Sequence, residues 1–140
     1  TLAQKVPVAG VVIVTTPQDI ALLDAKKGLK MFERVDVPVL GIIENMSLHV
    51  CSNCGHVEPI FGEGGGAKMA EEYGIELLGQ LPLERGIREQ ADGGNPTVAA
   101  NAESTTALLY RGIARKLAAK LAQRAKDYST KFPTIVIKND

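Results

Sequence analysis

Three short, continuous runs of apolar residues constrain the fold of this chain more than any other feature. They span residues 10–14, 39–43 and 77–80. They do not alternate with polar residues, a pattern that is typical of strands covered on both faces. Segments with helical character separate the runs, and a strand–helix–strand–helix–strand order predicts an α/β fold with a parallel sheet and flanking helices.

The first helix has the clearest pattern. Thr16 is the expected N-cap and Pro17 the expected first helical residue. Five residues at positions i, i+4, i+7, i+8 and i+11 share one face of this helix: Ala21, Ala25, Gly28, Leu29 and Phe32. Further helices are expected at about residues 66–73, 83–91 and 102–125.

The composition narrows the class of protein. The chain has 140 residues, 16 Lys+Arg and 16 Asp+Glu, which fits one domain and gives no indication of nucleic-acid or membrane-surface binding. No apolar run approaches the roughly 20 residues of a membrane span, and no signal-peptide pattern opens the chain. Two cysteines without a disulfide framework fit a reducing compartment. We therefore expect a cytoplasmic protein that binds neither nucleic acid nor membrane.

The beginning of the chain predicts a fragment of a longer protein. The first residue is Thr1, and residues 1–5 are typical of the end of a helix. Three strands also make a thin sheet, and residues 11–14 would have an exposed side unless upstream strands covered them.

The two cysteines, Cys51 and Cys54, lie in one loop that follows the second apolar run. A two-residue gap lets both sulfurs converge on one metal centre, and soft thiolates select zinc, copper(I) or iron–sulfur clusters. Such sites usually have four ligands. The pair is therefore half of a site, which a second copy, a partner or nearby histidines would have to complete.

Several interpretations of this loop compete. A thioredoxin-like redox pair needs a helix after the cysteines, and Pro59 disfavours one. A zinc site within the chain, completed by His49 and His56, would pack four ligands into eight residues. A zinc or iron–sulfur site shared by two chains needs no such crowding. Two free thiols in a loop remain the simplest alternative.

The glycine-rich segment 61–69 is not a phosphate-binding loop. A Walker A motif needs a second glycine followed by Lys and Ser or Thr. Ala67 stands in place of that glycine, and Met69 stands in place of the hydroxyl residue. We interpret the segment as the flexible start of a helix.

Asn45 follows the second apolar run directly, at the edge where open α/β sheets bind ligands. Its carboxamide can both donate to and accept from a purine edge. A residue that caps its own turn is an equally good interpretation.

Together these segments resemble the C-terminal half of the Mrp/ApbC-type iron–sulfur carrier ATPases, within the MinD/ParA-like P-loop class. The resemblance rests on residues 12–21, 41–47, 51–56, 59–62 and 81–96, including the sequence Glu44-Asn45-Met46. It implies that residues 1–126 are the C-terminal part of a P-loop ATPase domain of MinD-like fold, without its Walker A half. A metal-binding loop would span residues 47–60, and residues 127–140 would form a C-terminal tail.

The resemblance also implies a function. Family members form a homodimer that binds a [4Fe–4S] cluster between subunits through a cysteine pair, here Cys51 and Cys54. They bind ATP with the Asn of this motif, here Asn45, near the adenine, and Pro82 and Leu83 would close over the base. ATP binding and hydrolysis would control cluster loading and delivery to apo iron–sulfur proteins. A zinc-bridged dimeric interaction module and a MinD/ParA-like positioning ATPase are the alternatives.

The resemblance assigns no catalytic residue to this chain. The Walker A lysines and magnesium ligands of the family lie upstream of the region that matches Thr1. We therefore expect ATP and magnesium to act in the complete protein, and this chain alone to release no phosphate from ATP. A steady-state phosphate assay with both added checks this, and magnesium-dependent turnover in a clean preparation would contradict it.

Overall fold

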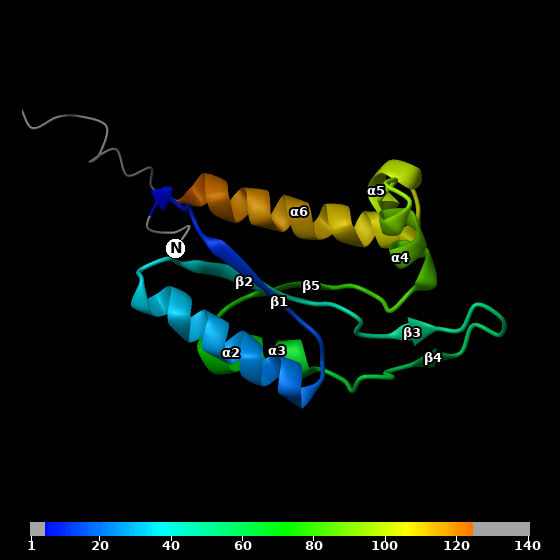
Figure 1. Cartoon of the computed structure of the whole chain (residues 1–140), viewed down its shortest axis with the longest axis horizontal. Helices are drawn as coiled ribbons and strands as arrows, with labels where there is room; N and C mark the ends of the chain where they lie inside the picture. Colours follow the sequence, from blue (N-terminus) through cyan, green and yellow to red (C-terminus); the bar gives the residue numbers. More distant parts are fainter. Residues whose placement is uncertain (1–4, 125–140) are drawn as a thin grey trace, which may run out of the picture.

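The computed structural model describes residues 5–124, which form a small parallel sheet between two layers of helices (Figure 1). The sheet contains β1 (Val11–Thr15), β2 (Val39–Glu44) and β5 (Leu77–Gln80), in the order β1-β2-β5. Both strand pairs are parallel. The three predicted strands and the α/β class with a parallel sheet are thus confirmed.

Helices cover both faces of this sheet. α2 (Asp19–Arg34) and α3 (Gly65–Tyr73) pack on one face, and α6 (Thr105–Gln123) packs on the other (Figure 1). One core lies under α2 and α3 and includes Leu29, Ile42 and Met69, while a second lies under α6. Full burial of side chains of this size contributes roughly 1.5–3 kcal/mol each, which makes these two cores the main source of stability.

Helix boundaries differ slightly from the sequence prediction. α2 begins at Asp19 with Gln18 at the N-cap position, so the prediction of Thr16 as N-cap and Pro17 as first helical residue is wrong. The Thr16 hydroxyl donates instead to the Gln18 side chain at 2.7 Å. The other helices lie within about three residues of their expected starts, with α4 at Arg85–Asp92.

Three short elements have no counterpart in the prediction. They are the two strands of a hairpin, β3 (His49–Val50) and β4 (Val57–Glu58), and the one-turn helix α5 (Thr97–Ala100). The hairpin strands have two residues each, and α5 is a single turn, so neither a continuous apolar run nor a helical period marks them. The strand-like segment 132–137 and the predicted end of the last helix at Ala125 lie outside the described residues.

The carboxyl edge of the sheet organises the rest of the chain. The segments that leave β2 and β5 continue side by side, because the Ser47 N–H donates to the Leu81 carbonyl and the Leu83 N–H donates to the Leu48 carbonyl. The hairpin β3–β4 projects outward from this edge (Figure 1). No helix within residues 5–124 is long and apolar enough to cross a membrane.

Candidate functional site

The cysteine pair lies in the turn of the β3–β4 hairpin. The Cys51 N–H donates to the His56 carbonyl and the Gly55 N–H donates to the Cys51 carbonyl, both at 2.8 Å. Gly55 has a φ of +72°, which glycine adopts without strain. Cys51 is half-buried and Cys54 is exposed. The hairpin therefore presents two free thiols on a tight turn that stands away from the helices.

The turn also makes Cys51 more acidic. The backbone N–H of Asn53, followed by the backbone N–H and the side chain of Cys54, lowers the pKa of the Cys51 thiol below its ordinary value. Partial burial opposes this effect, and the nearby His49 adds a small further lowering of the pKa. Since the thiolate is the form that binds metals, the turn prepares Cys51 to act as a ligand.

The histidines do not complete a metal site with the cysteines. His49 Nδ1 lies 3.0 Å from the Leu83 carbonyl oxygen, so this ring nitrogen is engaged with the segment after β5. Among residues 5–124, no three His, Cys, Asp or Glu side chains gather closely enough to hold a metal ion. The structure thus places Cys51 and Cys54 together, without His49 and His56 as further ligands.

The predicted base-binding residues all lie at the carboxyl edge of the sheet. The Asn45 N–H donates to the Thr15 carbonyl at 2.7 Å, and Asn45 Oδ1 accepts from the Met46 N–H at 3.0 Å. The side chain thus caps its own turn. Asn45 also lines a hollow of about 510 Å³ along β1. Pro82 and Leu83 are half-buried in the segment that runs beside the one following Asn45.

One buried acid at this edge was not predicted from the sequence. Glu44, the last residue of β2, is only 1% exposed. Its carboxylate accepts hydrogen bonds from the Gly66 N–H and from the Gln80 side chain. An acidic residue that directly follows an apolar strand run was the available signal.

Comparison with known proteins identifies the family. Residues 1–118 match the family described as ParA, the NUBPL iron-transfer P-loop NTPases. The chain belongs to this family. The resemblance to iron–sulfur carriers that the sequence motifs indicated is thereby confirmed.

Curated relatives agree with this assignment. The chain is 64% identical over 114 residues to an iron–sulfur cluster carrier protein of Pseudomonas fragi, which covers 81% of the chain and 40% of that protein. It is 62% identical over 121 residues to the carrier of Escherichia coli strain K12, covering 86% of the chain and 33% of the relative. The mouse iron–sulfur cluster transfer protein NUBPL is 45% identical over 120 residues, which cover 86% of this chain and 38% of the mouse protein. The chain thus spans about 33–40% of the length of these relatives.

Solved structures confirm a MinD-like P-loop NTPase fold. A nucleotide-binding protein from Archaeoglobus fulgidus, in complex with ADP, aligns with a TM-score of 0.56 and 34% identity over 69% of this chain and 38% of that one. The septum site-determining protein MinD of Pyrococcus horikoshii, with Mg-ADP, aligns with a TM-score of 0.59 and 24% identity. The alignment covers 80% of this chain and 42% of the MinD chain.

The lowered pKa of Cys51 predicts a specific pH dependence of its reactivity. In a Cys54→Ser variant, the rate of iodoacetamide alkylation should rise with pH around a midpoint below the roughly 8.5 of an ordinary cysteine, because the thiolate forms earlier. The same variant unfolded in urea provides the reference midpoint. A folded midpoint equal to or above the unfolded one would contradict the prediction.

Proposed function

We propose that this chain is the cluster-binding part of an iron–sulfur carrier, which holds a [4Fe–4S] cluster as cargo and transfers it to apo iron–sulfur proteins. Cys51 and Cys54 of one chain and the same pair of a second copy provide the four thiolates that such a cluster requires. In the complete protein, loading and delivery depend on ATP and magnesium.

The pair of free thiols on the projecting hairpin is the observation that carries this proposal. Two cysteines on a projecting hairpin, in a chain of an iron-transfer family, are half of a four-thiolate site. No third ligand lies beside them among the described residues. An identical half-site on a second chain supplies the missing ligands by symmetry, since homo-oligomers most often pair around a two-fold axis.

Apolar side chains on the hairpin support contact with a second copy. Val50 and Val57 are direct cross-strand partners, so their side chains share one face of the hairpin. They are 52% and 51% exposed, and Leu48 and Ile60 nearby are also exposed. Grouped exposed apolar side chains are typical of interaction surfaces. A homodimer through the cysteine loop would cover this surface.

The same geometry suits transfer of the cargo. A cluster shared by two exposed hairpins loses half of its ligands when the hairpins separate, so a modest change in the dimer can release it. Soft thiolates on an exposed turn also leave the cluster open to exchange with the thiols of a recipient. The recipients are therefore apo-proteins with free cysteines. We place this role in the cytoplasm, without binding to nucleic acid or membrane.

The nucleotide would bind at the carboxyl edge of the sheet. Asn45, Pro82 and Leu83 are the residues proposed to contact the base. Their support is their common location at this edge, where ligands of open α/β sheets bind. The Asn45 carboxamide would have to exchange its bond to the Met46 N–H for bonds to the base.

Metal analysis tests this proposal. Protein reconstituted without oxygen should contain about four iron and four sulfide per two chains, and a Cys51→Ser/Cys54→Ser variant should contain neither. A His49→Gln/His56→Gln variant is the matched control, and it should keep the cluster because it retains all four thiolates. Loss of the cluster from the native protein should accompany its appearance in an added apo-protein.

Two results would contradict the proposal. Stoichiometric zinc without acid-labile sulfide, in a folded dimer, would favour a zinc-bridged interaction module. A cluster that depends on the histidines would contradict a site made of four thiolates. The likeness to MinD is below 25% identity and shows the fold alone, so it lends no support to a positioning role.

A further inference from the structure

The buried acid Glu44 has no role in the cluster site or in the proposed base pocket. It lies at the end of the central strand β2 and is 1% exposed, and within residues 5–124 it is the one acidic residue that is buried. Burial of a carboxylate is costly unless hydrogen bonds replace water. A buried acid with all its bonds directed at particular segments therefore suggests a positioning role.

Both carboxylate oxygens of Glu44 are used. Oε2 accepts from the Gly66 N–H at 2.5 Å, and Oε1 accepts from Gln80 Nε2 at 2.6 Å. Its backbone carbonyl accepts from the Leu81 N–H at 2.8 Å. A single residue thus joins the ends of β2 and β5 to the first turn of α3, where free N–H groups favour a negative charge.

The glycine at position 66 matches this contact. A Cβ on Gly66 would lie 2.9 Å from Glu44 Cβ and 3.0 Å from its Oε2. Gly65 and Gly66 are both buried, and Gly64 caps α3 in the left-handed conformation. Gly65 and Gly66 are therefore closely packed on their neighbours, whereas a Cβ on Gly64 would meet no other atom. Gly66 brings the helix backbone close enough for the carboxylate to reach it.

The Glu44–Gly66 hydrogen bond closes the segment that carries the cysteines. The chain leaves the sheet after Glu44, forms the hairpin with Cys51 and Cys54, and returns to the body of the protein at Gly66. The outgoing half is fixed to the segment after β5 by several hydrogen bonds. On the returning half, no hydrogen bond joins residues 59–63 to β1, β2 or α2 in the described part of the chain.

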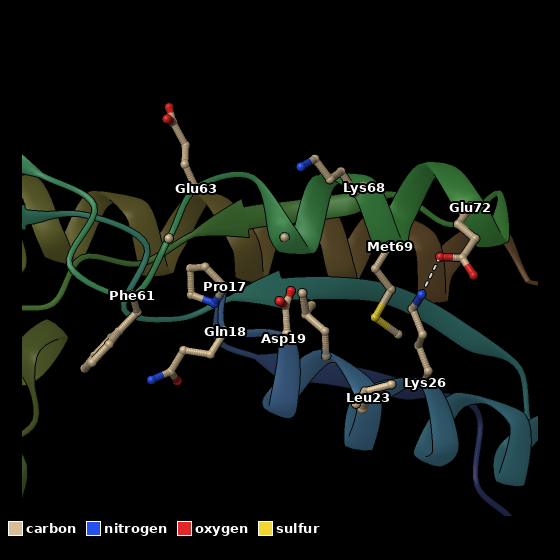
Figure 2. A pocket seen from close by; sticks show the side chains of 13 residues that line it. Pro17, Gln18, Asp19, Leu23, Lys26, Phe61, Glu63, Lys68, Met69 and Glu72 are labelled. Carbon is tan, nitrogen blue, oxygen red and sulfur yellow. Dashed lines mark hydrogen bonds and ion pairs between the residues drawn. The ribbon is translucent and has the colours of Figure 1, made fainter.

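The returning half also borders open space. A hollow of about 570 Å³ is lined by residues of α2, by residues of α3 and by the segment that contains Phe61 and Glu63 (Figure 2). The Lys26–Glu72 ion pair lies at one end of this hollow, between α2 and α3. Residues 61–63 line this hollow, and Gly62 lies close to Pro17 at its edge. The first hydrogen bond that fixes the returning half to the sheet is the one to Glu44.

We propose that Glu44 is a positioning residue for the cysteine loop. Its carboxylate holds Gly66 and Gln80 together and so fixes the direction in which Cys51 and Cys54 are presented. Asn45 is the next residue in the chain, so a nucleotide that draws on the Asn45 carboxamide acts beside the group that anchors the loop. This link between nucleotide and thiols rests on the proposed function, whereas the anchoring of the loop does not.

Amide hydrogen exchange of the intact protein, read by mass spectrometry, tests the anchoring. Glu44→Asp keeps the charge but shortens the side chain by one methylene, so the carboxylate no longer reaches Gly66. Glu44→Gln removes the charge but keeps the reach. The carbonyl of the new amide at position 44 can accept from the Gly66 N–H. Its NH₂ group can donate to Gln80 Oε1 once the Gln80 amide has turned over. Glu58→Asp, the same change at an exposed acid of the hairpin, is the matched control.

We expect Glu44→Asp to exchange about tenfold faster over residues 57–66 and to leave residues 105–123 within about twofold of the native protein. Glu44→Gln and Glu58→Asp should resemble the native protein in both regions. Equal acceleration in both regions, including general unfolding, would overturn the proposal. So would a Glu44→Gln variant that exchanges as fast as Glu44→Asp, because charge and not reach would then be the cause.

This measurement needs no cluster, so it separates the two proposals. If Glu44→Asp loosens residues 57–66 in a protein that binds no iron, the positioning role stands and the carrier function fails. In protein that does bind the cluster, Glu44→Asp should also release iron to a chelator faster than Glu44→Gln. Equal release rates would show that the anchoring does not extend to Cys51 and Cys54, and would overturn that part of the proposal.

Discussion

The pairing of β2 with strands on both sides is the constraint on which the rest of the structure depends. β2 pairs with β1 and β5, and both of its faces are covered by helices. Its parallel partners end at the same edge, which brings the segments after β2 and β5 together. The hairpin with the two thiols is built on these segments. A change in the register of β2 would therefore displace the cysteine loop and the proposed base pocket at once.

The position of the thiols has a chemical consequence. A buried four-ligand site would hold its metal permanently, whereas two thiols on a projecting turn hold a metal only while other ligands are near. The lowered pKa of Cys51 favours the thiolate, and the exposure of Cys54 favours exchange. This combination suits a protein that carries a cluster better than one that keeps it for its own use.

The sequence predicted the large elements well because the helices have a long apolar period and the strands are continuous apolar runs. The strand at 77–80 and the helix ending at Tyr73 agree with the structure to the residue. Thr16 did not predict the start of α2 correctly, because its hydroxyl donates to the Gln18 side chain and does not cap the helix backbone. The hairpin strands are two residues long and become visible only through their pairing.

The site was predictable in part for a similar reason. Cys51 and Cys54 are recognisable from their spacing alone, and Asn45 from its place after a strand. Glu44 could be singled out as an acid after a strand, but its contacts could not, because its partners Gly66 and Gln80 are distant in sequence and meet it only in the folded chain. Contacts across 22 and 36 residues cannot be read from local patterns.

The central claim is that the half-site is completed by a second copy of this chain. Native mass spectrometry of the anaerobically reconstituted protein tests it most directly. The account predicts a species with the mass of two chains and one four-iron cluster, and a return to single chains when the cluster is removed by a chelator. A cluster retained on a single chain, or a cluster-bearing dimer that persists after substitution of both cysteines by serine, would contradict it.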